Sequence, residues 1–177
     1  MASLVPFYTK LHATSYYGQA GKNKLKDVLP RIKIPGVKTV LDFGAGRQSL
    51  GKVLAQPHLG FTVTSYDPAV PGIDVLPEGP FDAVVSTDVL EHIPYEEIDS
   101  LLETIVRLTG SRGFHHIATS PANLRLPDGR DAHLIQEMSA WWAKKFEALG
   151  VKVIEAIDTG KPNGRDYTAA LITFDKI

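Results

Sequence analysis

Short β-branched runs alternate with helical patterns along most of the chain, and this alternation limits the possible folds more than any other feature. The strand-like runs are bounded by turn residues and cover residues 39–41, 61–64, 81–85, 114–118, 151–157 and 169–174. Strands that alternate with helices predict crossover connections and a mostly parallel sheet with helices on both faces. We therefore expect a doubly wound three-layer α/β sandwich that binds ligands beyond the carboxyl ends of its strands.

Helices are expected at residues 23–31, 49–55, 95–108 and 140–149. The third pattern ends at Gly110, and the fourth begins after Ser139 as N-cap and ends at Gly150. The last two strands are joined by the turn-rich residues 158–164, which leave no room for a helix. These strands are therefore expected to pair antiparallel at one edge of the sheet.

The length and composition favour one compact domain. The chain has 177 residues, of which 44% are hydrophobic and 22% charged, and no apolar run is long enough for a membrane span. The N-terminal segment lacks the pattern of a secretion signal, so we expect a cytoplasmic protein. The absence of cysteine excludes thiolate nucleophiles and cysteine-bound metals. No tight ligand spacing such as H-x-x-x-H occurs, so no metal site is predicted.

The net charge of −1 is unevenly distributed, because residues 1–60 hold nine lysines and arginines but two aspartates. A basic N-terminal segment is compatible with a polyanionic partner. Positions 22, 24 and 26 do not share one helical face, however, which weakens this interpretation. The basic residues concerned are Lys22, Lys24, Lys26, Arg31 and Lys33.

A buried strand leads into a glycine turn at Gly44 and Gly46, and glycines there let the backbone approach a ligand closely. Asp67 ends the next strand 21 residues after Gly46, where a ribose-binding carboxylate is expected. Dinucleotide-binding folds usually have an apolar residue at the position of Asp42 and a third glycine at that of Ser49. A carboxylate suits a cofactor with a cationic amino-acid end. These residues favour S-adenosylmethionine.

Several segments resemble, in order, the successive motifs of class I S-adenosylmethionine-dependent methyltransferases, most closely the small methyltransferase-domain group. They are VLDFGAG at 40–46, YD at 66–67, FDAVVSTDVLEHI at 81–93, and His133 ahead of WAKKFEALG at 142–150. The resemblance covers roughly residues 36–177 and implies a mostly parallel seven-stranded sheet with an antiparallel C-terminal edge hairpin. The chain departs from it at Gln48, where many members have glycine, and in a short third-strand region at 72–77.

Carried over residue by residue, the resemblance implies a set of cofactor-binding positions. Gly44 and Gly46 would pack under the methionine part, Asp42 would orient its ammonium group, and Asp67 would bind the ribose hydroxyls. Asp74 would lie near the adenine. The residues expected to line the pocket close to the sulfonium end the strand at 81–85 and are Ser86, Thr87 and Asp88.

Histidines are the candidate catalytic groups, because methyl transfer to an O–H or protonated N acceptor requires removal of a proton. Either His92 or His133 is expected to act as the general base, because the pKa of an ordinary histidine is near ~6.5. His115 and His116 lie inside a strand and are expected to pack on opposite faces of the sheet. Residues 1–35 are expected to form a helical cover over the 36–177 cofactor-binding domain, with aromatic residues such as Tyr8 in it.

The expected reaction is in-line transfer of a methyl group to an O or N atom of a small-molecule or nucleotide-like acceptor. A cytosine-C5 methyltransferase is excluded because it needs a cysteine nucleophile. The alternatives are an RNA or DNA methyltransferase, a non-catalytic S-adenosylmethionine-binding partner subunit and a nicotinamide-dependent oxidoreductase. Asp42 and Ser49 count against the last of these.

Overall fold

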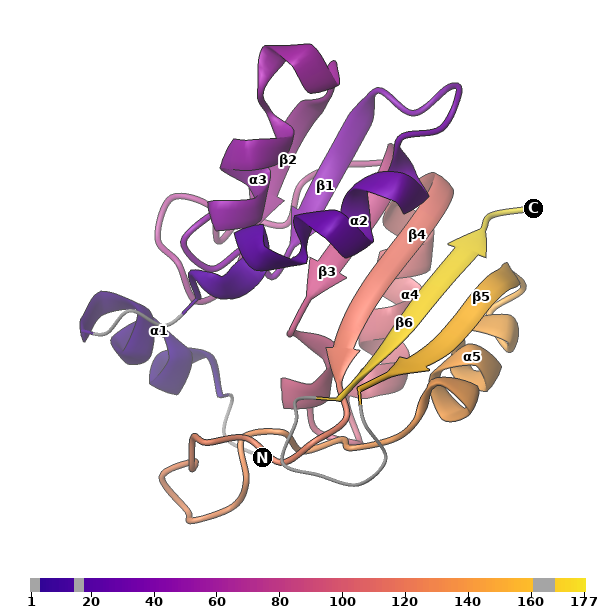
Figure 1. Ribbon diagram of the computed structural model, residues 1–177. Helices are drawn as coiled ribbons and strands as arrows, with labels where there is room; N and C mark the ends of the chain where they lie inside the picture. The colour runs from indigo at the N-terminus through magenta and orange to yellow at the C-terminus, as the bar shows by residue number, and fades with distance from the viewer. Residues whose placement is uncertain (1–3, 15–17, 161–167) are drawn as a thin grey trace.

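A six-stranded sheet forms the centre of the molecule, and its strand order is β2-β1-β3-β4-β6-β5 (Figure 1). The computed structural model describes residues 4–14, 18–160 and 168–177. The strands are β1 (Thr39–Phe43), β2 (Thr62–Tyr66), β3 (Phe81–Thr87), β4 (Thr109–Ala118), β5 (Lys152–Thr159) and β6 (Ala169–Asp175).

The pairing of the strands confirms the doubly wound arrangement with an antiparallel edge. Strand β1 pairs parallel with β2 on one side and with β3 on the other, and β3 pairs parallel with β4. Strand β6 lies antiparallel between β4 and β5. The chain therefore changes direction across the sheet at β1 and β3, which is the position where open α/β sheets bind their ligands.

The prediction of seven strands is wrong by one within the described residues. The expected third strand at 72–77 is an irregular segment. Pro71, Pro77 and Pro80 have no backbone N–H and so limit any ladder in this stretch. Instead, the carbonyl of Ile73 accepts a hydrogen bond from the backbone N–H of Asp67 at 2.9 Å, which folds the segment back onto the end of β2.

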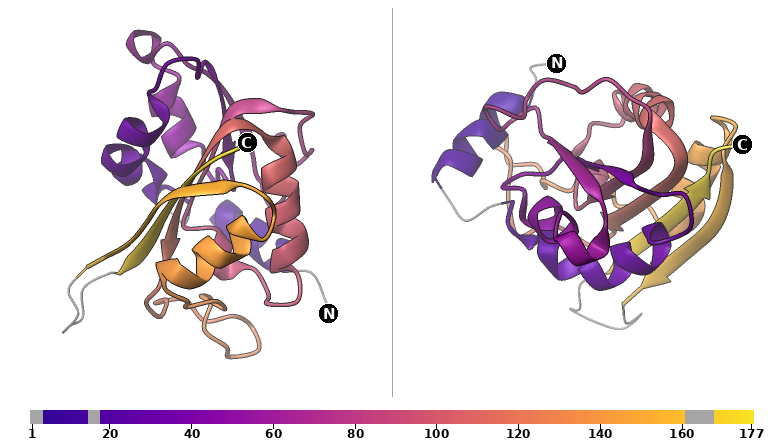
Figure 2. Two further views of the ribbon diagram at one scale, coloured as in Figure 1. Left: turned by 90° about the vertical axis from the view of Figure 1, so that its right-hand side faces the viewer. Right: turned by 90° about the horizontal axis from the view of Figure 1, so that it is seen from above.

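Helices cover both faces of the sheet, as the two views in Figure 2 show. Helices α2 and α3 lie on one face and α4 and α5 on the other. The helices are α1 (Val5–Thr14), α2 (Leu25–Ile32), α3 (Ser49–Leu54), α4 (Ile98–Leu108) and α5 (Ser139–Glu147), with short 3₁₀ turns η1 (Ala20–Lys24), η2 (Pro57–Leu59) and η3 (Leu90–His92).

Alternation along the buried strands divides the core into two layers. Val40 packs with the α2 and α3 side, whereas its neighbour Leu41 packs with the α4 and α5 side. Val84 and Val85 of β3 divide in the same way. Successive side chains of a strand point to opposite faces, so a strand buried on both faces is apolar throughout.

The start of α5 differs from the prediction. Ser139 is the first helical residue and not the N-cap, and the carboxylate of Asp158 accepts hydrogen bonds from its backbone N–H at 2.7 Å and its hydroxyl at 2.9 Å. A side chain of β5 thus accepts a hydrogen bond from a backbone N–H at the start of the helix, in place of a local N-cap residue.

The segment expected as a cover is divided between two roles. Val28 and Ile32 of α2 are fully buried against the sheet, so α2 belongs to the core layer. Helix α1 has no buried residue and lies beyond the end of the sheet toward which β4 points (Figure 1). None of the described helices combines the length and apolar character needed to cross a membrane.

Candidate functional site

A cavity of about 760 Å³ lies at the carboxyl ends of β1, β2 and β3. Its floor comes from the strand ends and the turns that follow them, and α1 with residues 18–21 forms one wall. The opposite end is bounded by residues 121–124 and His133, which belong to the long loop after β4. The cavity therefore lies at the switch point of the sheet, and the predicted N-terminal cover contributes to it.

The glycine turn after β1 has the backbone geometry that the sequence predicted. Gly44 and Gly46 have φ of 74° and 49°, a region that side chains other than glycine rarely adopt. A Cβ on Gly44 would lie 2.4 Å from the side chain of Val89, and one on Gly46 would lie 2.9 Å from the backbone of Gly18. The glycines thus allow the turn to pack against β3's end and the N-terminal segment.

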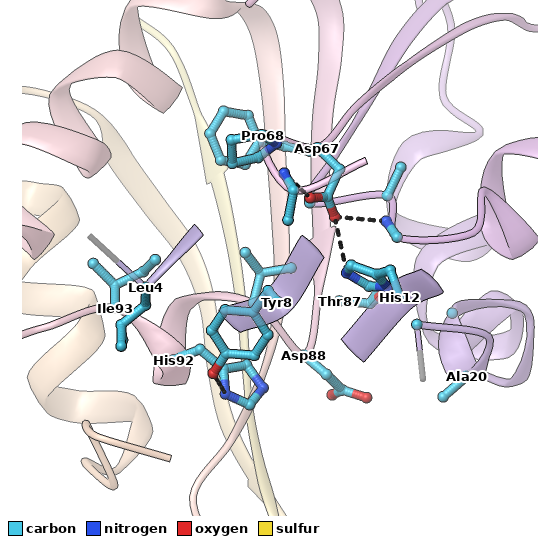
Figure 3. A pocket seen from close by; sticks show the side chains of 18 of the residues that line it. Leu4, Tyr8, His12, Ala20, Asp67, Pro68, Thr87, Asp88, His92 and Ile93 are labelled. Carbon is cyan, nitrogen blue, oxygen red and sulfur yellow. Dashed lines mark hydrogen bonds and ion pairs between the residues drawn. The ribbon is translucent and has the colours of Figure 1, made fainter. Parts of the chain in front are cut away.

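Asp67 is held by the backbone at the end of β2 (Figure 3). Its two carboxylate oxygens accept hydrogen bonds from the N–H groups of Gly46 at 2.8 Å and Ala69 at 2.9 Å. His12 of α1 approaches the same carboxylate, with Nε2 3.9 Å from Oδ2. Each oxygen has a second lone pair, so this fixed carboxylate retains the capacity to accept from a ligand hydroxyl.

Asp42 also lines the cavity, but it is more deeply buried than Asp67. The residue is 2% exposed, and one carboxylate oxygen accepts from the N–H of Gly51 at 3.0 Å. Burial raises the pKa of Asp42 to about 7, and the neighbouring charge of Asp67 adds to the shift. A cation placed beside this carboxylate would favour its charged form.

The three residues at the end of β3 do not all face the cavity. Thr87 and Asp88 line it, whereas the buried hydroxyl of Ser86 hydrogen-bonds Nδ1 of His115 at 2.8 Å. Asp88 has a φ of 56°, and its carboxylate contacts Nδ1 of His116 at 3.0 Å and Nζ of Lys24 at 3.5 Å. The structure thus brings two of these three predicted pocket residues to the cavity.

Asp74 lies outside the cavity lining. Its side chain is exposed and accepts a hydrogen bond from the N–H of Gly72 at 3.0 Å. The fold-back of the proline-rich segment places Asp74 in a surface turn. Its position near an adenine stays a prediction.

His92 and His133 meet at the far end of the cavity. Their ring centroids are 4.9 Å apart. Nδ1 of His92 lies 2.8 Å from the carbonyl of Ala132 and 3.1 Å from the Tyr8 hydroxyl, a contact visible in Figure 3. Nδ1 of His133 lies 2.6 Å from the carbonyl of Ser120. Because a carbonyl can only accept, both Nδ1 atoms are donors.

The environment of His92 disfavours its charged form. Removal from water and the neighbouring His133 together lower the pKa of His92 to about 4, although the carbonyl of Ala132 opposes the shift. The ring is therefore neutral near neutral pH. With a proton on Nδ1, the lone pair of a neutral ring is on Nε2.

Glu91 is the buried charged group whose placement sequence reasoning missed. It is fully buried in η3, and one oxygen accepts from the N–H of Ala118 at 3.1 Å. Burial raises the pKa of Glu91 well above its usual value, and the charge of Asp88 acts in the same direction. Nothing in the sequence indicated that Glu91 is buried. It showed only that Glu91 precedes His92, and charged residues in strand-to-helix turns are usually exposed to water.

Tyr8 and His12 are contributed to the cavity by α1. Tyr8 was expected only as one of the aromatic residues of the N-terminal cover, and its contact to His92 and that of His12 to Asp67 required the tertiary structure. A carbonyl oxygen of α1 is also engaged, since the Arg47 guanidinium donates to the His12 carbonyl at 2.6 Å. Arg47 therefore ties the helix to the glycine turn.

Comparison with known proteins identifies the family. A family model described as "Methyltransferase domain" matches residues 17–158. The chain belongs to this methyltransferase family. The resemblance to class I S-adenosylmethionine-dependent methyltransferases is thereby confirmed. A search of curated protein sequences finds no match.

Solved methyltransferase structures share the fold over essentially the whole chain. The magnesium protoporphyrin IX methyltransferase of Synechocystis PCC 6803, solved with S-adenosylhomocysteine, is 20% identical with a TM-score of 0.65, over 100% of this chain and 89% of that one. The 1,6-didemethyltoxoflavin-N1-methyltransferase of Burkholderia thailandensis was solved with 1,6-didemethyltoxoflavin and S-adenosylhomocysteine. It is 16% identical with a TM-score of 0.63, over 99% of this chain and 91% of that one. Phosphoethanolamine N-methyltransferase 2 of Haemonchus contortus is 12% identical with a TM-score of 0.73, over 99% of this chain and 60% of that one.

Proposed function

We propose that this methyltransferase-family protein transfers a methyl group from S-adenosylmethionine to an O or N atom of a small-molecule or nucleotide-like acceptor. The observation that carries the proposal is one continuous cavity. It joins the glycine turn and the carboxylates of Asp42 and Asp67 at one end to the rings of His92 and His133 at the other.

The residues at the first end fit this cofactor. Asp67 offers a carboxylate fixed by two backbone N–H groups, which suits a ribose diol. Asp42 offers a buried carboxylate, which suits the ammonium group of the methionine part. Bound S-adenosylmethionine would supply a methyl group already activated on sulfur. The chain's remaining tasks are then to align the acceptor, to exclude water and to accept a proton.

The acceptor end combines apolar walls with two imidazoles. Leu4, Ile93, Pro121 and Leu124 are among the apolar residues that line it. These walls favour a compact organic acceptor that leaves water on binding. We propose His133 or His92 as the group that accepts the proton, since each ring keeps its lone pair on Nε2.

The neighbours' names support an acceptor of small size. They are methyltransferases named for magnesium protoporphyrin IX, for 1,6-didemethyltoxoflavin and for phosphoethanolamine. A nucleic-acid acceptor is less favoured, because two of the five basic residues that suggested it are used internally. Lys24 pairs with Asp88, and the Arg31 guanidinium donates to the carboxylate of Glu155.

The cofactor assignment is tested by melting the protein with S-adenosylmethionine, S-adenosylhomocysteine and NADH in parallel. A ligand at about 100 times its Kd stabilises the native state by about 2.7 kcal/mol. For a domain of this size we expect the first two ligands to raise the Tm by roughly 5–10 °C, and NADH to leave it unchanged. A shift with NADH alone would contradict the proposal, and no shift with any ligand would contradict cofactor binding by the isolated chain.

Turnover is tested with a panel of phenols, amines and nucleotides, with formation of S-adenosylhomocysteine as the readout. For an accepted substrate, we expect His133→Ala to slow turnover by at least tenfold and to change the Kd of S-adenosylmethionine less than twofold. The matched control is His58→Ala, an exposed histidine on η2. Cofactor binding with no turnover across the panel would favour the non-catalytic partner subunit.

A further inference from the structure

We propose that Glu91, His92 and His133 form a binding site for a divalent transition-metal cation at the acceptor end of the cavity. Each residue offers one ligand atom, and the three atoms lie within 4.8 Å of one another. The site goes beyond methyl transfer, because cation binding by these three side chains requires neither the cofactor nor an acceptor.

Glu91 supplies the first reason. Its side chain is fully buried, yet no group among the described residues hydrogen-bonds Oε2. The other oxygen and the backbone carbonyl of Glu91 are both used, by the N–H groups of Ala118 at 3.1 Å and Ile135 at 3.0 Å. A buried carboxylate oxygen without a donor is costly, and a bound cation removes that cost.

The two histidines supply the second reason. Each is fixed by a hydrogen bond from Nδ1 to a backbone carbonyl, of Ala132 for His92 and of Ser120 for His133. Metal-binding histidines commonly donate their second ring N–H to a carbonyl in this way, which sets the tautomer and the ring orientation. Both rings line the cavity, so the cluster borders open space.

The donor set indicates the kind of cation. Two imidazole nitrogens and one carboxylate oxygen suit zinc, cobalt, iron or manganese, whereas magnesium and calcium prefer oxygen ligands alone. Ligands of a tetrahedral ion at about 2.1 Å lie about 3.4 Å apart, so binding draws the three atoms, now within 4.8 Å of one another, together by up to about 1.4 Å. The nearby carboxylate of Asp88 adds negative charge, although it is engaged with His116 and Lys24.

Three protein ligands leave at least one coordination position for a further group. On the proposed function, this position would take the oxygen or nitrogen of the acceptor and fix it within the cavity. A cation would also use the Nε2 lone pairs that the general-base proposal needs. Proton acceptance by His92 or His133 therefore belongs to the metal-free protein, and with the cation bound the two rings position the acceptor instead.

The experiment uses the full chain, stripped with a chelator and titrated with Co²⁺ alone in the absence of cofactor. Visible absorption and calorimetry report the environment and stoichiometry. We expect one Co²⁺ per chain, with Mg²⁺ binding at least tenfold more weakly. His133→Ala and Glu91→Gln are each expected to weaken Co²⁺ binding more than tenfold, and His58→Ala to leave it unchanged.

The proposal is overturned if the chain does not bind Co²⁺ saturably, or if His133→Ala binds it as well as the original protein. Should Glu91→Gln fail to fold, as its Tm without metal would show, His133→Ala in the loop after β4 still decides the question. S-adenosylmethionine binding is measured separately. Loss of cation binding with intact cofactor binding would refute the metal site alone, and the reverse result would refute the proposed cofactor alone.

Discussion

The two carboxylates of the cofactor end illustrate how one residue type acquires different properties from its surroundings. Asp42 is almost fully buried with one backbone donor, and burial raises its pKa to about 7. Asp67 receives two backbone N–H groups in place of one. Charge on Asp42 is therefore sensitive to pH in the range where a methyltransferase would work, and to any cation beside it.

The raised pKa of Asp42 predicts how cofactor binding depends on pH. Between pH 5.5 and 7 the carboxyl of Asp42 is largely protonated, so we expect the affinity for S-adenosylmethionine to rise with pH, by up to about tenfold per pH unit. Calorimetry across this range in wild type and Asp42→Asn checks it. The same slope in both proteins would show that another group is responsible.

Without ligand, the stability of the fold is expected to change with pH in the opposite direction to the cofactor affinity. The folded pKa of Asp42 lies above its ordinary value of 3.8, so between 3.8 and about 7 the folded state holds a proton that the unfolded state does not. Asp42 therefore lowers the free energy of unfolding as pH rises through this window. Denaturant titrations should show this decline in wild type, and a smaller one in Asp42→Asn.

Asp67 allows a matched pair of substitutions. We expect Asp67→Asn to weaken S-adenosylmethionine binding more than tenfold, about 1.4 kcal/mol, while its amide oxygen still accepts one backbone N–H. Asp67→Ala leaves the donors of Gly46 and Ala69 without their acceptor, and each costs about 1–3 kcal/mol. Calorimetry and denaturant unfolding separate the two effects. Normal affinity in Asp67→Asn would remove the ribose assignment.

Among the elements, α1 is held by polar contacts with no buried residue of its own. Tyr8 meets His92, and His12 approaches Asp67 (Figure 3). The Arg47 guanidinium donates to the His12 carbonyl. An element with little burial opens at low cost. We propose that α1 acts as a cover that is strengthened when the cavity is filled.

Hydrogen exchange tests the cover. We expect S-adenosylhomocysteine to slow exchange of the α1 amides by at least tenfold, because the ligand would cover a helix that has no buried residue of its own. Helix α5, which packs on the far side of the sheet, serves as the internal control. Equal rates in α1 with and without ligand would contradict a covering role.

The glycine turn shows why an element must be seen in its packing. The positive φ of Gly44 was expected, but the sequence could not show that Val89 occupies the space above it. Gly44→Val would therefore disrupt the junction of β1 and β3 as well as any ligand contact. Substitution of Asp67 is the better test of cofactor binding.

For the molecule as a whole, the antiparallel hairpin closes one side of the core. Phe174 of β6 is fully buried and packs against Phe146 of α5 at 4.9 Å between ring centroids and against His115 at 5.7 Å. Gly113 of β4 is required beside it, since a Cβ there would lie 2.2 Å from the ring. The hairpin thus stabilises the sheet at a distance from the cavity.

Phe174→Ala tests this division between scaffold and site. We expect a loss of about 3–5 kcal/mol in the free energy of unfolding, because the substitution leaves a cavity in the core. The affinity of the remaining folded protein for S-adenosylmethionine should change less than twofold. Ile177→Ala, at a residue that is 92% exposed, should cost less than about 0.5 kcal/mol. A large loss of affinity in Phe174→Ala would show that the hairpin shapes the cofactor site.

Local sequence patterns are sufficient to predict the alternation of strands and helices, the antiparallel edge and the cavity-lining positions of Asp42, Gly44, Gly46 and Asp67. These features depend on local patterns, because side-chain periodicity and glycine backbone freedom are read over a few residues. Ser86, Thr87 and Asp88 were all expected to line the pocket, but successive strand side chains point to opposite faces, and Ser86 turns away from the cavity to His115.

The tertiary structure alone decided the long-range features. It folded the segment at 72–77 back onto the end of β2 in place of a strand, left Asp74 at the surface, and brought Tyr8, Glu91 and His133 to one place. His133 lies 41 positions after His92, and its location depends on how the loop after β4 packs against η3. Such contacts join residues that no sequence spacing relates, because they are set by the balance of burial and hydrogen bonding over the whole chain.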